Sequence, residues 1–153
     1  MHTDEKIKNL LGASGFDISY LIKLDCENNK IIIPARAIVI KVNEYQKRLM
    51  ICIMNNINCK REIIRIVWPD KHMYVNDNNY HQLVFQLRRL FQKNGLSRDL
   101  ISTIPFYGLT INENRLKSLS RFNDDLITST LSETKINEKK TSFLSNIYAK
   151  QKQ

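Results

Sequence analysis

Glycine, proline, cysteine and histidine are all scarce in this sequence, and each shortage narrows what the chain can do. Four glycines supply no glycine-rich phosphate loop, and the three histidines show no spacing typical of metal ligands. The sequence contains no nucleophile motif and no paired titratable groups that suggest catalysis. We therefore predict a protein that is not an enzyme and that uses neither a metal nor another cofactor.

Long apolar runs and paired cysteines are missing too. The most apolar stretch, residues 31–42, is broken by a proline and two basic residues and is too short to cross a bilayer. The first nine residues are polar and charged, unlike a signal peptide. Three cysteines with no CxxC pair predict reduced thiols in a cytoplasmic protein, with Cys52 buried in an apolar helix.

Acidic residues are outnumbered, with 15 against 24 basic ones and a formal net charge of +9. Between residues 36 and 98 twelve basic residues face only four acidic ones, so nearly all of the excess lies in the middle of the chain. This balance favours a polyanionic partner, either nucleic acid or an anionic membrane surface. Because no helix pairs a lysine-rich face with a large apolar one, nucleic acid is the better match.

The N-terminal part predicts a short helix within residues 1–13 and then a small antiparallel sheet. Residues 20–24, 30–33 and 37–42 are rich in β-formers and are separated by turn-forming residues. Asn43 and Gln46 then form a capping box that opens a helix ending at Asn55 and Asn56. Its predicted buried residues are Tyr45, Leu49, Cys52 and Ile53.

Two further helices and a hairpin complete the predicted domain. Residues 59–68 form a helix that Pro69 stops, and its apolar side holds Ile63, Ile64, Val67 and Trp68. Residues 76–94 repeat apolar positions in steps of three and four, with Asn76 or Asp77 as N-cap and Gly95 beyond the end. Residues 100–112 contain two β-prone arms around a turn, which predicts a hairpin.

Three helices followed by a hairpin, with amide and basic groups on the third helix, are the layout of a winged helix-turn-helix. We predict an α+β fold with three parts. Residues 1–19 form an N-terminal segment, residues 20–112 a winged-helix DNA-binding domain, and residues 113–153 a polar tail that is mobile or partly helical.

The sequence resembles the OmpR/PhoB-type winged helix-turn-helix, with the ToxR/CadC-like bacterial regulators as the most similar branch. The resemblance depends on Trp68 and on the segments VNDNNYHQLVFQLRRLF (residues 75–91) and TIPFYGLTI (residues 103–111). It implies an N-terminal sheet and a C-terminal hairpin that pairs back onto that sheet. It also implies transcription regulation within a family that serves phosphorelay signal transduction, with helix 76–94 in the major groove and wing 100–112 at the flanking groove.

The resemblance assigns candidate DNA contacts residue by residue. Base-reading positions on the third helix are Asn78, Asn79, Gln82, Phe85, Gln86 and Arg89. The resemblance also assigns Arg88 to a phosphate and Thr103 and Tyr107 to the wing, and we add His81, Lys93 and Phe106 as expected phosphate or wing contacts. Independently of the family, general attraction to phosphates is expected from Lys47, Arg48, Lys60, Arg61 and Arg65.

Three departures from the family pattern qualify the resemblance. Pro105 and Phe106 stand where many relatives carry a wing arginine, and Leu109 replaces an aromatic residue that follows the wing glycine. ToxR-like proteins usually continue into a membrane-spanning helix, which this sequence lacks, so it corresponds to a soluble relative or to the cytoplasmic part of a longer protein.

Two partner classes besides DNA stay open at this point. Phe85 and Phe106 would suit a winged helix used mainly for protein contact, for example with RNA polymerase or a co-regulator. A single small domain covers little of a DNA groove, so self-association on tandem half-sites is also open. The leading hypothesis is a regulator of transcription that binds specific double-stranded DNA sequences.

Overall fold

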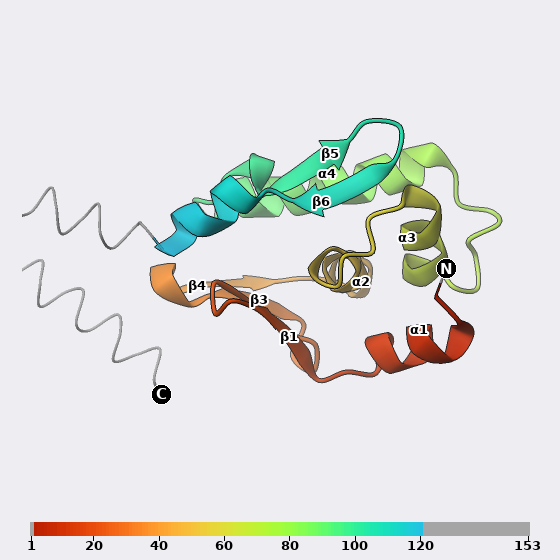
Figure 1. The fold of residues 1–153 in the computed structure, drawn as a ribbon, viewed down its shortest axis with the longest axis horizontal. Coiled ribbons are helices and arrows are strands. Elements are labelled where there is room, and N and C mark those ends of the chain that lie inside the picture. Colours follow the sequence, from red (N-terminus) through yellow and green to blue (C-terminus); the bar gives the residue numbers. More distant parts are fainter. Residues whose placement is uncertain (1, 121–153) are drawn as a thin grey trace, which may run out of the picture.

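A four-stranded antiparallel sheet and a separate two-stranded hairpin lie on opposite sides of helix α2 (Glu44–Met54) in the computed structural model, which describes residues 2–120 (Figure 1). This arrangement confirms the predicted α+β class and the antiparallel sheet near the N-terminus. One hydrophobic core joins the sheet, the helices and the hairpin. The sheet contributes the buried Ile31, the helices contribute Leu49, Ile63 and Leu87, and the hairpin contributes Leu109.

The sheet runs in the order β1 (Gly15–Ile18), β2 (Ile22–Asp25), β3 (Lys30–Ile33) and β4 (Ile38–Lys41). In β2 and β3 alternate residues are buried against the helices, as the two-residue period of a strand requires. The predicted strands correspond to β2, β3 and β4. Strand β1 was not predicted, because only two of its four residues (GFDI) are apolar and the other two are a glycine and an aspartate.

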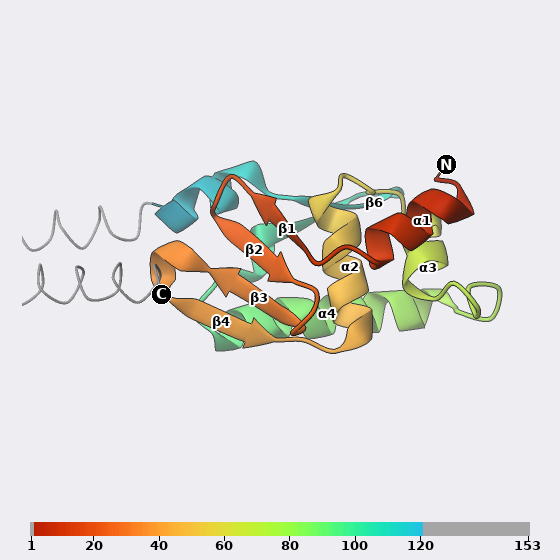
Figure 2. The ribbon, with the colours of Figure 1, turned by 90° about the horizontal axis from the view of Figure 1, so that it is seen from below.

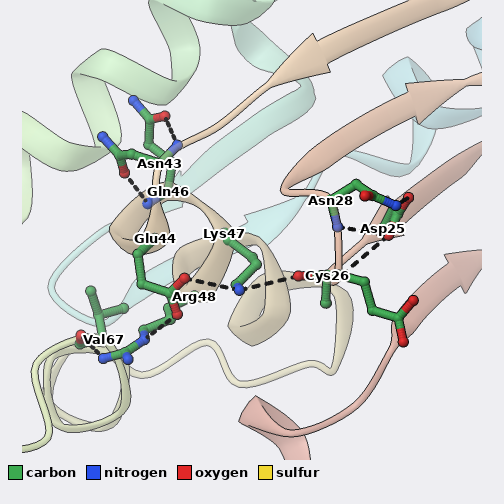
Figure 3. A network of polar contacts seen from close by, with 10 residues as sticks. Asp25, Cys26, Asn28, Asn43, Glu44, Gln46, Lys47, Arg48 and Val67 are labelled. Carbon is green, nitrogen blue, oxygen red and sulfur yellow. Dashed lines mark hydrogen bonds and ion pairs between the residues drawn. The ribbon is translucent and has the colours of Figure 1, made fainter.

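Helix α1 (Asp4–Leu11) leads into the sheet, and α2, α3 (Lys60–Val67) and α4 (Asp77–Lys93) follow it (Figures 1 and 2). The predicted capping box of α2 is present. The Asn43 side chain accepts from the Gln46 N–H, and the Gln46 side chain accepts from the Asn43 N–H, both at 2.9 Å (Figure 3). Helix α3 ends before Pro69, as predicted.

Two burial predictions for these helices were wrong. Tyr45 is 42% exposed rather than buried, because its ring packs on the outside against Trp68 with the ring centroids 5.8 Å apart. The core side of α3 is formed by Ile63, Ile66 and Val67, whereas Ile64 and Trp68 are only partly buried. A helix of two turns has a wide apolar side, and the sequence alone did not show which edge of it faces inward.

Strands β5 (Ile101–Ile104) and β6 (Gly108–Ile111) form the predicted hairpin. The expectation that it pairs back onto the N-terminal sheet was wrong for residues 2–120. The hairpin is a separate two-stranded sheet, and its additional backbone contact is a bridge between Gly108 and Cys59 at the start of α3. Its position therefore depends on the helices, α2 and α3 among them, instead of on β1–β4.

Residues 113–120 continue from the hairpin as a helix and pack against the fold through the buried Leu116 and Leu119. This helix lies beside the connection between β3 and β4 in both views (Figures 1 and 2), where Arg36 donates to the Ser118 carbonyl at 3.3 Å. The remainder of the predicted polar tail, residues 121–153, lies outside the described residues.

Candidate functional site

Helix α4 carries the largest set of exposed polar side chains that the sequence assigned to a function. Asn76 caps it, as predicted, by accepting from the Asn79 N–H at 3.0 Å. Gly95, just past the end, has the left-handed φ of +80° that glycine adopts without strain. Both ends of the helix are therefore specified locally, and its orientation follows from the residues that it buries.

The buried side of α4 directs the opposite side to solvent. Its buried residues are Tyr80, Leu83, Val84, Leu87 and Phe91. The exposed side chains on the remaining surface are Asp77, Asn78, Asn79, His81, Gln82, Phe85, Gln86, Arg89, Gln92 and Lys93. Among the described residues, Gln82, Gln86 and Arg89 have no side-chain hydrogen bond or ion pair, so their polar groups are available to a partner.

Asn79 differs from its neighbours because part of its side chain has a structural task. Its side-chain oxygen accepts from the Asn76 N–H at 3.1 Å and completes a capping box at the start of α4. Only the NH₂ group of the amide is then left to pair with a partner. Asn78, the adjacent exposed amide, takes no part in the capping box.

The hairpin is fixed to the start of α3 by main-chain hydrogen bonds. The Lys60 N–H donates to the Tyr107 carbonyl at 2.8 Å, and the Leu109 N–H donates to the Asn58 carbonyl at 3.0 Å. Gly108 permits this approach, because a Cβ on that residue would lie 1.7 Å from the Asn58 carbonyl oxygen. The turn between β5 and β6 is thereby held in a defined place.

Arg88 links α4 to the hairpin from the other side. Its Nε and one terminal nitrogen donate to the Ile101 carbonyl at 3.1 and 2.8 Å, and the same terminal nitrogen donates to Thr103 Oγ1 at 3.0 Å. Burial lowers the pKa of this guanidinium, and neighbouring Arg98 lowers it further. The resemblance implied a phosphate contact for Arg88, but the geometry leaves it one terminal nitrogen for that purpose.

A groove of about 690 Å³ separates α4 from the hairpin. Three cationic side chains line it, Lys60, Arg88 and Arg98, and no acidic residue does. The phenol oxygen of Tyr80 is buried at its inner wall without a hydrogen-bond partner among the described residues. The groove therefore offers positive charge to a ligand rich in hydrogen-bond acceptors.

The buried Tyr80 phenol gives a testable pH dependence. Burial raises the pKa of Tyr80 from its usual 10.0 to about 12, because the phenolate is poorly solvated there. Between these values the unfolded chain loses a proton that the folded chain keeps, so this contribution to stability is complete below pH 10 and is lost as the pH rises toward 12. Ultraviolet titration of Tyr80→Phe against the parent chain should remove a late-ionising phenol. Removal of an early-ionising one would contradict the burial.

Of the three predicted phosphate-binding cations of α3, Lys60 and Arg65 already have partners within the protein, and Arg61 has none among the described residues. Arg61 is exposed and has no side-chain partner among the described residues. Lys60 bonds to Asp77 at 2.8 Å, and this hydrogen bond lowers the pKa of the Asp77 carboxyl. Arg65 donates to Asp4 at 2.6 Å and to the His2 carbonyl, so it holds α1 against α3.

Lys47 and Arg48 of α2 are also committed, although both were predicted to lie outside the core as phosphate contacts. The Lys47 amine is largely buried and lies 2.9 Å from Glu44 and 3.3 Å from the Cys26 carbonyl (Figure 3). Arg48 bonds to Glu44 and to the Val67 carbonyl, both at 3.1 Å. These side chains join α2 to β2 and α3, so the cations at the groove are better candidates for a ligand.

Sequence reasoning did not select Arg98 as a site residue, although it counted its charge. Arg98 opens the short 3-10 turn η2 (Arg98–Leu100) between α4 and β5, and this connection brings it to the groove. Its exposed side chain has no partner among the described residues. The available signal was a basic residue directly between the predicted recognition helix and the predicted hairpin.

No known protein-family model and no curated protein matches this chain. Within residues 2–120, no cluster of histidine, cysteine, aspartate or glutamate side chains has the grouping that a metal ion needs. None of the helices in that part of the chain combines the length and apolar character required to cross a membrane.

Proposed function

We propose that this chain is a winged helix-turn-helix regulator of transcription that binds specific double-stranded DNA sequences. Helix α4 is the recognition helix in the major groove, and the β5–β6 hairpin is the wing at the flanking minor groove. The observation that carries the proposal is the row of unpaired Gln82, Gln86 and Arg89 side chains beside a groove with cationic lining.

The side chains on α4 suit the edges of bases in the major groove. Glutamine and asparagine form paired hydrogen bonds with adenine, and arginine forms them with guanine. Phe85, which is 58% exposed, offers an apolar surface to a thymine methyl group. An α-helix fits the width of the major groove, so the exposed face of α4 can reach these edges without unfolding.

The groove between α4 and the hairpin suits the sugar–phosphate backbone. A duplex that presents its major groove to α4 and its minor groove to the wing must pass the intervening backbone strand between the two elements. Lys60 and Arg98 line that passage, and Arg61 lines a second hollow that shares Lys60, Phe106 and Tyr107 with it. Such contacts position the protein on any duplex, whereas α4 supplies the preference for one sequence.

The second candidate is a winged helix that mainly binds another protein, and the exposed aromatic residues favour it. Phe106 is fully exposed and Phe85 is more than half exposed, as anchor residues of a protein interface often are before binding. Contact with RNA polymerase or a co-regulator, and self-association on tandem half-sites, are compatible with either proposal.

Selection of duplexes from a random pool, followed by binding measurements at two salt concentrations, tests the proposed function. We expect enrichment of a defined motif, with log K falling by about 0.9 per contacted phosphate for each unit of log salt. If no duplex is enriched from the pool, or if the affinity for DNA does not depend on salt, the proposed DNA-binding function is wrong and the protein-contact alternative is left.

Replacement of Gln86 by alanine tests whether α4 reads bases. We expect Gln86→Ala to reduce the preference for the selected motif over random duplex by about 1–3 kcal/mol, the usual value of a good paired base contact. Asn9→Ala is the matched control, because Asn9 is an exposed amide on the distant helix α1. Equal weakening on selected and random duplexes would show that Gln86 is not a reader.

A further inference from the structure

The turn of the hairpin places a large aromatic residue where its backbone favours glycine. Pro105 occupies the second position of the turn, and the Tyr107 N–H donates to the Ile104 carbonyl at 3.0 Å. Phe106 occupies the third position with φ +60°. This pattern fits a type II turn, whose third residue is usually glycine or asparagine, and a bulky residue there is an outlier.

The Phe106 side chain contributes nothing to the fold that would offset this strain. It is completely exposed, with a relative accessibility of 111%. The backbone on its C-terminal side is nevertheless held firmly, because Tyr107 and Leu109 bond to Lys60 and Asn58. A strained and exposed ring that also borders a groove with cationic lining favours a function in binding, since folding alone does not account for it.

The surroundings of Phe106 indicate an anionic partner. On one side lies the groove toward α4 with Lys60, Arg88 and Arg98 and no acidic side chain. On the other side lies a shallower surface where Arg61 stands with Glu62 and Asp77, and Asp77 is paired with Lys60. Duplex DNA combines negative charge with stacked apolar bases, whereas a typical protein pocket supplies only the apolar part.

We propose that Phe106 inserts its ring between adjacent base pairs of the minor groove beside the site read by α4, and bends the duplex there. This inference rests on the proposed function and adds a DNA deformation to it. Proteins that insert apolar residues between base steps partly unstack the bases and kink the duplex by about 20–90°. The wing would then be held on the DNA by stacking of Phe106 against bases, whereas a wing with a charged tip would be held by contacts to phosphates or base edges.

The test uses the full chain and its selected duplex, with fluorescent labels at the duplex ends and 2-aminopurine at successive flanking steps. We expect the parent chain to shorten the end-to-end distance and to raise the fluorescence of one flanking 2-aminopurine. Phe106→Ala should abolish both signals and weaken binding roughly tenfold to hundredfold, as loss of one base–aromatic stack does. Its salt dependence should equal that of the parent, because no phosphate contact is lost.

Two further variants separate insertion from other roles of the ring. Phe106→Leu keeps an apolar wedge and should retain most of the bend. Tyr20→Ala is the matched control, because Tyr20 is also an exposed aromatic residue in a hairpin turn with positive φ, between β1 and β2. It should bend DNA as the parent does. Thermal melting of each variant checks that the fold is intact.

The measurements of binding and bending distinguish failure of base insertion from failure of the proposed function. A parent chain that binds its motif without bending it, or a Phe106→Ala variant that still bends it, overturns insertion while the proposed function stands. Unchanged affinity and bending in Phe106→Ala would show that the ring does not contact DNA. A parent chain that selects no duplex overturns both the proposed function and this inference.

Discussion

Gly108→Ala is expected to lower the free energy of unfolding by about 3 kcal/mol, near the upper end for overpacking of a close contact. The added Cβ would lie 1.7 Å from the Asn58 carbonyl oxygen and 2.9 Å from the Lys60 nitrogen. Both are backbone atoms, which cannot rotate away as a flexible side chain does. The hairpin must therefore move away from α3, which breaks the two main-chain hydrogen bonds that flank Gly108 and exposes the buried Leu109.

Urea denaturation followed by circular dichroism measures this loss as a lower midpoint. Gly12→Ala is the matched control, because Gly12 is exposed after α1 and a Cβ there would lie 3.1 Å from its nearest neighbour, the Lys8 carbonyl oxygen. That carbonyl would have to move by only a few tenths of an ångström, so the loss should be clearly smaller than for Gly108→Ala, within about 1 kcal/mol. An unchanged midpoint for Gly108→Ala would contradict the close approach of the hairpin to α3.

The close approach of the hairpin to the start of α3 also determines the position of the hairpin tip, on which the proposed DNA contact depends. Because α3 holds the hairpin turn through Asn58 and Lys60, a movement of the hairpin changes where Phe106 points. Gly108→Ala should accordingly reduce DNA bending even under conditions in which the variant is fully folded. The glycine thus connects local packing to the placement of the tip.

Local signals in the sequence were sufficient to predict most elements of this fold. The capping box at Asn43, the N-cap at Asn76 and the glycine at position 95 fix helix ends through local conformation and hydrogen bonds within a few residues, so they are readable without tertiary information. The pairing of the hairpin was not readable in this way. It depends on the contact of Gly108 with Cys59, 49 residues earlier, and a strand pattern does not name its partner.

The exposed face of α4 was also predictable, since the period of the apolar residues determines which side chains remain outside. The role of each cation was not. Lys47, Arg48 and Arg65 look equivalent to Arg61 in sequence, but carboxylates and carbonyl groups from other elements engage the first three. Only the tertiary arrangement shows that Arg61 and Arg98, like Arg89, have no side-chain partner in the described part of the chain.

Arg88 and Arg89 are neighbours in sequence, but only Arg88 is hydrogen-bonded within the protein, so their replacement should affect stability and DNA binding in opposite ways. Arg88→Ala should lower the free energy of unfolding by about 3 kcal/mol, because it removes charged hydrogen bonds to Ile101 and Thr103 and leaves a carbonyl group unpaired. Arg89→Ala should change stability by less than about 0.5 kcal/mol, since its exposed side chain has no partner among the described residues. In DNA binding, Arg89→Ala should instead lose motif preference by about 1–3 kcal/mol.

Urea denaturation and competition binding of the two variants distinguish a positioning residue from a DNA contact. Combining Arg88→Ala with Thr103→Ala in a double-mutant cycle should give a coupling energy of at least about 0.5 kcal/mol, because the two side chains share a hydrogen bond. Arg88→Lys should restore charge but little stability, since an ammonium group cannot reproduce the paired geometry at the Ile101 carbonyl. If Arg88→Ala kept full stability and lost only DNA affinity, its guanidinium would be a phosphate contact, and the wing would depend on α3 alone for its position.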